Sequence, residues 1–344
     1  MTKIIVPASI VAVISLALVL TGCSCSKKSN SNKLPIIPGT GTGTGTGTGG
    51  GGGIADKYTG DEGIENDPDV VFAEMFEENT LDDVKANWEE AKDDGVLSLS
   101  TDVPSNSPGT NSLLMTHTGG SGNTGGHLYS RLLPGYDQLY LRFYVKFDTA
   151  CHPIHHFVHM GGYNPSSAWP QGGAGERPTG DDRLTTGIEP CGDKWRWDFY
   201  SYWMEMRGNP GGPEFWGNDF INDENFTVER GKWLCVELMM KMNSPTTDKN
   251  GEQRMWINGQ DWTKDGQLVS HLLKGSPKGN WVWDSFNPDP VGTPFEGFRW
   301  RSSESLNLNF LWMLLYITTA PPGHVSKVWF DHIVVATKYI GPLK

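Results

Sequence analysis

The sequence lacks an excess of positive charge. Its 28 lysine and arginine residues are outnumbered by 40 aspartate and glutamate residues, which gives a formal net charge of −12. Nucleic-acid binding requires clustered basic side chains that neutralise phosphates, so we expect no nucleic-acid partner. The same charge disfavours polyanionic ligands unless basic residues gather at one place.

Cysteine is scarce, and its spacing does not fit a zinc site. The chain has five cysteines, of which Cys23 is assigned to another role below. In an exported protein the remaining Cys25, Cys151, Cys191 and Cys235 can form disulfides, but their connectivity cannot be deduced from the sequence. Cys151 and Cys191 flank the same region and are the pair we expect, whereas Cys235 lies in an apolar strand and suits a buried thiol.

Long stretches with helical periodicity are also missing. Short alternations of apolar and polar residues recur instead, separated by glycine, proline, asparagine and aspartate. This pattern is typical of antiparallel β-sandwiches, so the sequence predicts an all-β fold. We assign it to a single domain spanning residues 54–344, because one sandwich can reach that size.

A long apolar run occurs at the N-terminus. Residues 4–20 follow Lys3 and end at Leu20-Thr21-Gly22-Cys23. This ending resembles the bacterial lipobox, which implies that residues 1–22 are a removed signal peptide and that Cys23 carries lipid. A transmembrane anchor is the alternative, although the run is short for crossing a bilayer. We expect an exported protein, held through lipid alone at the outer membrane or cell surface.

The next segment cannot bury a hydrophobic core. Residues 23–53 are dominated by glycine, threonine and serine. Such a composition gives a flexible tether between an anchor and a folded domain.

Two strand-like segments carry a polar and aromatic face opposite an apolar one. In residues 140–147 the apolar face is Leu141, Phe143, Val145 and Phe147. Alternation with a period of two places that face in the core. In residues 195–207, Trp195, Trp197, Phe199 and Trp203 behave in the same way. The opposite faces are either solvated or line a sugar groove, and the substrate-binding candidates on them are Tyr140, Tyr144, Arg196, Tyr200 and Tyr202.

Other segments predict loops and turns. Residues 161–187 are rich in glycine and charge, which favours a long loop. Residues 232–242 and 254–258 form an expected hairpin. A short helix is expected within residues 81–94, around Trp88.

Three groups of residues resemble the fungal cellulose-induced protein and the glucuronan lyases similar to it. The first is Pro108-Gly109-Thr110-Asn111-Ser112-Leu113, followed by Gly126-His127-Leu128-Tyr129. The second is the segment 140–146 with His156 downstream. The third is the segment 328–337, preceded by Asn309-Phe310-Leu311-Trp312. The resemblance implies a two-sheet antiparallel β-jelly roll, a concanavalin-like sandwich, with a groove on its concave sheet.

The same resemblance implies a structural calcium ion. Its ligands would be Glu77, Asn111, Asp331 and the backbone oxygen of Pro108. Calcium prefers such oxygen ligands. Where the family has a second aspartate, this chain has His332. The alternative is that Glu77 and Asp331 are ordinary carboxylates near strand ends.

A lyase acting on a uronic-acid polysaccharide needs three groups: a cation or donor that neutralises the carboxylate, a base for the C5 proton, and an acid for the leaving oxygen. Arg142 and Lys146 are the candidates for the first role. The resemblance offers His127 and His156 as base. The candidates for the acid are Tyr200, Tyr202 and Tyr316.

Each candidate also has an ordinary structural interpretation. A histidine on a strand is more often a hydrogen-bonded structural residue than a catalyst. His155 and His159 would lie about 13 Å apart on a regular strand, so we expect no shared metal ion. Three functions remain open: a surface-anchored polysaccharide lyase, a non-catalytic carbohydrate-binding protein, and a structural or adhesive surface protein.

Overall fold

The computed structural model describes residues 52–122, 124–209 and 211–344. The expected signal peptide, Cys23 and almost all of the expected tether lie outside the described residues. Within the described part of the chain, no helix is both long and apolar enough to cross a membrane.

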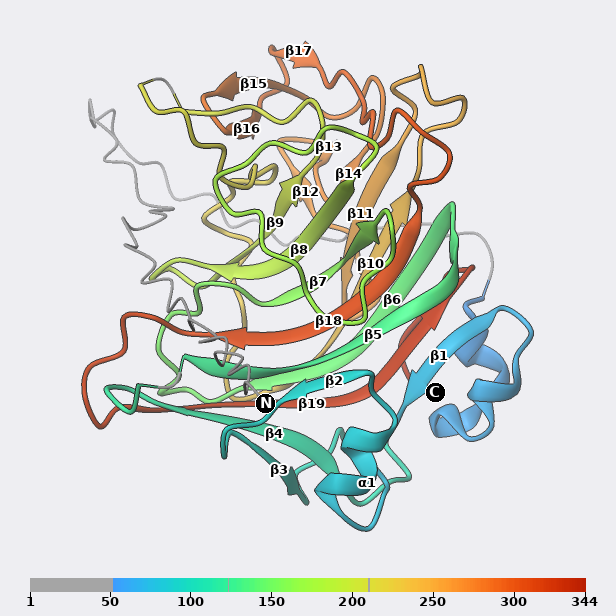
Figure 1. The fold of residues 1–344 in the computed structure, drawn as a ribbon, viewed down its shortest axis with the longest axis vertical. Coiled ribbons are helices and arrows are strands. Elements are labelled where there is room, and N and C mark those ends of the chain that lie inside the picture. Colours follow the sequence, from blue (N-terminus) through green and yellow to red (C-terminus); the bar gives the residue numbers. More distant parts are fainter. Residues whose placement is uncertain (1–51, 123, 210) are drawn as a thin grey trace, which may run out of the picture.

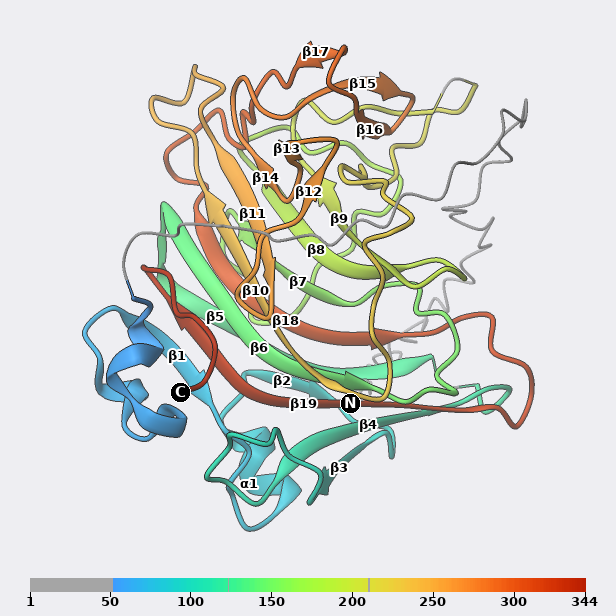
Figure 2. The ribbon, with the colours of Figure 1, turned by 180° about the vertical axis from the view of Figure 1, so that it is seen from behind.

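Two antiparallel sheets stack face to face, and their curved strands run across the molecule (Figures 1 and 2). The larger sheet has eight strands, ordered β14 (His271–Leu272), β11 (Glu252–Ile257), β10 (Trp233–Lys241), β6 (Gln138–Phe147), β19 (Val325–Ala336), β4 (Ser112–Thr118) and β3 (Leu97–Ser100), with β1 (Val70–Glu74) also paired to β19. The smaller sheet has six, ordered β2 (Glu90–Lys92), β5 (Gly125–Tyr136), β18 (Leu308–Tyr316), β7 (Val158–Tyr163), β8 (Arg183–Cys191) and β9 (Arg196–Tyr202). The prediction of an all-β, two-sheet jelly roll is confirmed.

Smaller elements cover the ends of the sandwich. Two short ribbons consist of β12 (Thr263–Lys264) with β13 (Gln267–Leu268), and of β15 (Lys278–Val282) with β16 (Ser285–Pro288) and β17 (Thr293–Pro294). The short helices are η1 (Ile54–Lys57), η2 (Thr59–Asp61), η3 (Ile64–Asn66) and α1 (Leu81–Ala86). In Figure 1 the three-stranded ribbon lies at the top, and η1–η3 lie beside the C-terminus at the lower right.

A short helix is present within residues 81–94, but it ends before Trp88, so its predicted placement around Trp88 is wrong. Thr80 begins α1, because its hydroxyl accepts a hydrogen bond from the backbone N–H of Asp83. Asp82 and Asp83 lie in the first turn, where their negative charges interact favourably with the positive end of the helix dipole. The helix ends at Ala86, and residues 90–92 join the smaller sheet as β2.

The predicted apolar faces form the core between the sheets. Leu141, Phe143, Val145 and Phe147 of β6 are completely buried, and Trp197 and Phe199 of β9 meet them from the other sheet. The expected hairpin is present as β10 paired with β11. The long loop is shorter than predicted, since β7 extends to Tyr163 and β8 begins at Arg183.

The polar face of β6 corrects one set of predicted site residues. Arg142 is completely buried and pairs with the carboxylate of Asp61 in the N-terminal helical segment. Lys146 pairs with Asp102 and lies over the Trp329 ring. Arg142 therefore has no surface with which to touch a polysaccharide, and Lys146 lies on the larger sheet, away from the cavity described below.

The two tyrosines on that face are covered in the same way. Tyr140 stacks against Trp256 with ring centroids 6.2 Å apart. The Tyr144 hydroxyl accepts a hydrogen bond from the backbone N–H of Leu343 at 2.9 Å. Alternation assigned these side chains to one face correctly, but it could not show that the chain ends cover that face.

The expected disulfide is not formed. Cys151 is a buried thiol outside any disulfide, and its Sγ lies 3.5 Å from the backbone oxygen of His152. Burial raises the pKa of this thiol to about 12. Cys235 is likewise buried outside a disulfide, as its apolar strand predicted.

Candidate active-site groove

The outer face of the six-stranded sheet carries a row of aromatic side chains on β18. Leu311, Met313 and Leu315 point into the core, so the intervening residues point outward. Trp312 and Leu314 line a cavity of about 190 Å³ on this face. The other lining residues used below are His156, His159, Arg183, Tyr200 and Tyr202.

An irregularity between β18 and β7 places two histidines on this face. Trp312 lies opposite His159, and Tyr316 lies opposite His156. Between these two pairs, residues 313–315 of β18 lie opposite only two residues of the neighbouring segment, Phe157 and Val158. Both of those residues are buried in the core. This bulge turns His156 and His159 outward together, which strict alternation would not do.

Glu189 of β8 joins the two histidines. His156 Nδ1 lies 2.9 Å from Glu189 Oε1, and His159 Nε2 lies 3.7 Å from the same oxygen. The side chain of Glu189 is only 5% exposed, whereas that of His156 is 24% exposed and faces the cavity. An ionised carboxylate only accepts, so the proton of neutral His156 lies on Nδ1 and Nε2 keeps its lone pair.

His159 is the more enclosed of the two histidines. Burial, and to a smaller extent the neighbouring His156, lowers its pKa to about 3. Gly187 of β8 lies beneath its ring, and a Cβ there would come within 2.7 Å of the imidazole. Glycine at this position lets the imidazole lie against the sheet.

Tyrosines surround the exposed imidazole. The Tyr316 ring is stacked parallel to the His156 ring at 5.8 Å, and the Tyr200 ring is 5.1 Å away. The hydroxyls of Tyr200 and Tyr202 are 3.4 Å apart. Gly217 makes room for Tyr200, because a Cβ there would lie 2.6 Å from its ring.

Arg183 brings positive charge to the cavity. Its Nη2 donates to the backbone oxygens of Gly173 and Glu176, at 3.1 and 2.7 Å. Its guanidinium lies 5.8 Å from the centroid of the Tyr202 ring. The arginine therefore fixes the glycine-rich loop at the cavity wall and presents a cation to it.

His127 lies on the same face but on the far side of Trp312. Its ring is 5.7 Å from Trp312, which in turn is 5.5 Å from His159. Its Nε2 pairs with Glu90 of β2. Burial lowers the pKa of His127 despite this carboxylate. His127 and His156 therefore lie at separate positions on the same face of the sheet, with Trp312 between them.

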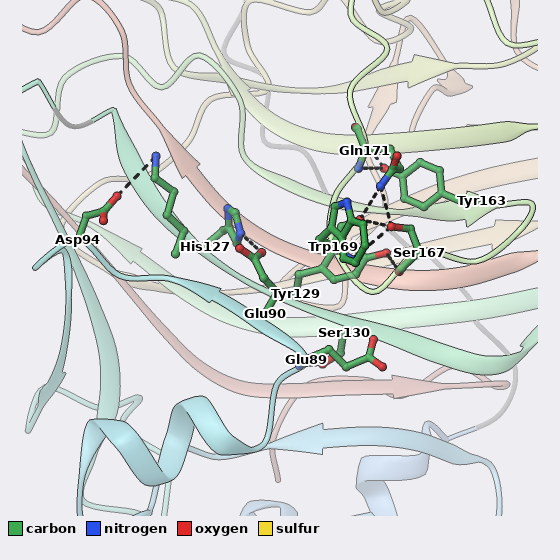
Figure 3. A network of polar contacts seen from close by, with 11 residues as sticks. Glu89, Glu90, Asp94, His127, Tyr129, Ser130, Tyr163, Ser167, Trp169 and Gln171 are labelled. Carbon is green, nitrogen blue, oxygen red and sulfur yellow. Dashed lines mark hydrogen bonds and ion pairs between the residues drawn. The ribbon is translucent and has the colours of Figure 1, made fainter. Parts of the chain in front are cut away.

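The loop between β7 and β8 closes this face on one side (Figure 3). The Tyr129 hydroxyl donates to the backbone oxygen of Ser167 at 2.8 Å, and the backbone N–H of Gln171 donates to the Tyr163 hydroxyl at 3.2 Å. Trp169 is 61% exposed at the rim. A second cavity, of about 600 Å³, lies along this loop and shares Tyr163, Gln171 and Arg183 with the first, so the two form one groove.

The fold brings some of the predicted site residues together and separates others. His156, Tyr200, Tyr202 and Tyr316 meet in the cavity region, with His127 further along the face. Arg196 does not line the cavity, and its guanidinium donates to the Asn222 side chain at 3.0 Å. The candidates that lie on the other sheet are Tyr140, Arg142, Tyr144 and Lys146.

Sequence reasoning missed Glu189, His159 and Arg183. The charge of residues 161–187 predicts a loop there, whereas Arg183 begins β8. Regular strand spacing separates His159 from His155 and so gives no reason to expect a metal ligand at His159. The signal that could have identified Glu189 is an acidic residue within a strand, because a carboxylate that becomes buried requires a partner.

The expected calcium ligands lie at another place, beside β1 and β19. Both carboxylate oxygens of Glu77 accept from the backbone N–H of Thr110, and Oε1 also accepts from that of Asn111. Asp331 Oδ2 is buried and accepts no hydrogen bond from the described residues. Burial, with a smaller effect of the Glu77 charge, raises the pKa of Asp331 to about 8. An unsatisfied buried oxygen beside a second carboxylate fits a cation that prefers oxygen ligands.

His332 does not replace the family's second aspartate as an oxygen donor. Its Nδ1 lies 2.9 Å from Asp61 Oδ2, and its Nε2 lies 2.8 Å from Ser107 Oγ. The imidazole therefore ties the loop that carries Pro108 and Asn111 to the N-terminal segment.

Comparison with known proteins shows a fold shared with the β-jelly-roll polysaccharide lyases. The marine PL-14 alginate lyase from Aplysia kurodai superposes with a TM-score of 0.50 at 14% identity, over 78% of this chain and 99% of that one. The endo-β-1,4-glucuronan lyase from the fungus Trichoderma reesei gives 0.43 at 20% identity, over 78% and 95%. A cellulose-induced protein gives 0.38 at 18% identity, over 72% and 87%. No protein-family model and no curated protein matches the sequence.

Proposed function

We propose that this protein is a lyase that cleaves a uronic-acid polysaccharide by β-elimination in the groove of its six-stranded sheet. The observation that carries the proposal is the His156–Glu189 pair, held at 2.9 Å next to two tyrosine rings, at a cavity that Arg183 also lines. The A. kurodai protein of the same fold is an alginate lyase by name, which supports a uronic-acid polymer as the substrate class.

Each step of the elimination has a residue in the cavity. Arg183 offsets the charge of the uronate carboxylate, which makes the neighbouring C5 proton more acidic. His156 Nε2 takes that proton while Glu189 holds Nδ1–H. The electron pair of the C5–H bond forms the C4–C5 double bond, and the bond from C4 to the bridging oxygen breaks.

A tyrosine hydroxyl supplies the proton that the leaving oxygen needs. The rings of Tyr316 and Tyr200 lie next to His156, and Tyr202 lines the same cavity, so all three are within the proposed sugar-binding region. Burial raises the pKa of Tyr316, which keeps its hydroxyl protonated at neutral pH and able to donate. Exposed Trp169 offers a flat surface for a sugar ring further along the groove.

The test is a search for unsaturated products. The purified protein, with calcium, is incubated with glucuronan, alginate, pectate and glycosaminoglycans, and ultraviolet absorbance of the unsaturated uronate is followed. We expect a rise with at least one polymer. His156→Ala should lower the rate about 100-fold or more, the usual contribution of a positioned general base.

His271→Ala is the matched control, because His271 pairs with Glu252 at the same 2.9 Å on the larger sheet, outside the cavity. Its rate should equal that of the unchanged protein. A flat trace on every polymer, together with retention on an immobilised polyuronate, would replace the lyase by a non-catalytic carbohydrate-binding protein.

We also propose that calcium binds Glu77, Asn111, Asp331 and the Pro108 carbonyl and stabilises the fold. The buried Asp331 oxygen supports this assignment. Chelation should lower the melting temperature, and calcium added afterwards should restore it. In Asp331→Asn the response to calcium should be lost, and an equal response in this variant would remove Asp331 from the ligand set.

Anchoring through Cys23 is a further proposal, which rests on the lipobox-like Leu20-Thr21-Gly22-Cys23. Mass spectrometry of the mature N-terminus should find lipid on Cys23, and Cys23→Ala should release the protein from the membrane fraction. Recovery of an unmodified Cys23 would contradict the anchor.

A further inference from the structure

Three potential ligand atoms converge at one corner of the cavity. His156, His159 and Glu189 each offer one atom, and all three atoms lie within 4.8 Å of one another. Glu189 lies on β8, His159 lies on the neighbouring strand β7, and His156 lies just before β7, where it is bridged to Tyr316 of β18. Rigid neighbouring strands hold a metal site more accurately than loops do.

The distances fit a four-coordinate zinc ion. Zinc binds imidazole nitrogen at about 2.0–2.1 Å and carboxylate oxygen at about 2.0–2.2 Å, so neighbouring ligand atoms of a tetrahedron lie about 3.4 Å apart. Here Glu189 Oε1 is 2.9 Å from His156 Nδ1 and 3.7 Å from His159 Nε2. These two separations lie on either side of the required one, and all three ligand atoms lie within 4.8 Å of one another. Rotation of the two imidazoles toward each other would complete the tetrahedral spacing.

The surroundings also suit a metal ion. The Thr185 hydroxyl lies 3.5 Å from His159 Nδ1, the nitrogen that would not bind the metal. Such a contact in the second shell orients a histidine ligand. His156 is the most exposed of the three ligands and lines the cavity, so a fourth position on that side is open to water or an anionic group.

We propose that His156, His159 and Glu189 form a zinc-type binding site for a divalent transition-metal ion, with its fourth position open to the groove. This arrangement of two imidazoles and one carboxylate selects transition metals over calcium, which prefers oxygen ligands. The site differs from the proposed calcium site in its ligands and in its sheet.

Metal binding has a chemical consequence that rests on the proposed lyase function. A metal ion on His156 Nδ1 requires the remaining proton of the neutral imidazole to be on Nε2. Nε2 then has no lone pair for the C5 proton. Zinc should therefore inhibit the elimination.

The decisive measurement is metal binding by itself. The full chain, purified without a histidine tag and saturated with calcium, is titrated with zinc in competition with a chromophoric chelator. We expect one zinc ion per chain. His159→Ala and Glu189→Gln should each weaken the affinity at least about tenfold, because two protein ligands replace three.

His271→Ala is again the matched control, because among the described residues the His271–Glu252 pair belongs to no group of three potential metal ligands. Its zinc affinity should be unchanged. Equal affinities of the unchanged protein and His159→Ala, or no zinc bound, would overturn the proposal.

Two further measurements do not depend on the folding of a variant. Cobalt added to the unchanged protein should give the strong visible absorption of a four-coordinate ion, and a weak six-coordinate spectrum would contradict the ligand set. If the protein proves to be an active lyase, zinc should inhibit it, and an unaffected rate at saturating zinc would refute the inhibitory role. If it has no lyase activity, the binding titration still decides the site.

Discussion

The buried pair of Asp61 and Arg142 gives the sharpest prediction about stability. Asp61 belongs to η2 and Arg142 to β6, and both side chains have 0% exposure. Asp61 also interacts with His332 Nδ1 at 2.9 Å. Asp61→Asn would leave the buried arginine charge without the carboxylate that is paired to it.

Breaking a buried pair by removing one partner costs about 3–5 kcal/mol. For a domain of this size each kcal/mol lowers the melting temperature by about 2–4 °C, so we expect a fall on the order of 10 °C. Asp61→Asn/Arg142→Met should lose less than the sum of the two single variants, because it leaves no isolated charge.

The assay is urea unfolding followed by tryptophan fluorescence at saturating calcium, since the proposed ligand Asp331 lies in the same electrostatic cluster. Glu224→Gln is the control. It breaks an ion pair with Lys194 in which both side chains are more than 60% exposed, so no measurable loss is expected. A loss below about 1 kcal/mol in Asp61→Asn would show that water reaches Arg142 and would refute the reasoning.

Three further predictions follow, two from burial and one from close packing. Burial raises the pKa of Glu237 to about 7, so the folded protein favours the protonated carboxyl, and the contribution of Glu237 to stability falls as pH rises from about 4.5 to 7. Across that interval the free energy of unfolding of Glu237→Gln should rise by about 3 kcal/mol relative to that of the unchanged protein. A constant difference in unfolding titrations would contradict the raised pKa. Cys151 and Cys235 should resist alkylation in the native state and react after unfolding, because burial raises the pKa of both thiols to about 12; rapid native labelling would count against this burial. Gly187→Ala should weaken zinc binding at least about tenfold with little change in melting temperature, because the new Cβ would displace the His159 ring, and an unchanged affinity would argue against that ligand.

Local pattern in the sequence predicted the fold class and the faces of the strands. Leu141, Phe143, Val145 and Phe147 enter the core because side chains alternate across a strand and the apolar set must leave water. The same rule placed Tyr200 and Tyr202 opposite the core tryptophans, where they line the cavity. The β10–β11 hairpin followed from its turn residues.

The tertiary structure decided which polar face became a groove. Alternation cannot show that the N-terminal helices and the C-terminal residues cover the outer face of β6, because those contacts join residues as distant as Asp61 and Arg142. Nor can it predict the bulge that turns His156 and His159 to one side, or the pairing with β8 that brings Glu189 to them. The sequence alone therefore determined an all-β chain with two polar strand faces, whereas long-range packing selected the face that carries the candidate site.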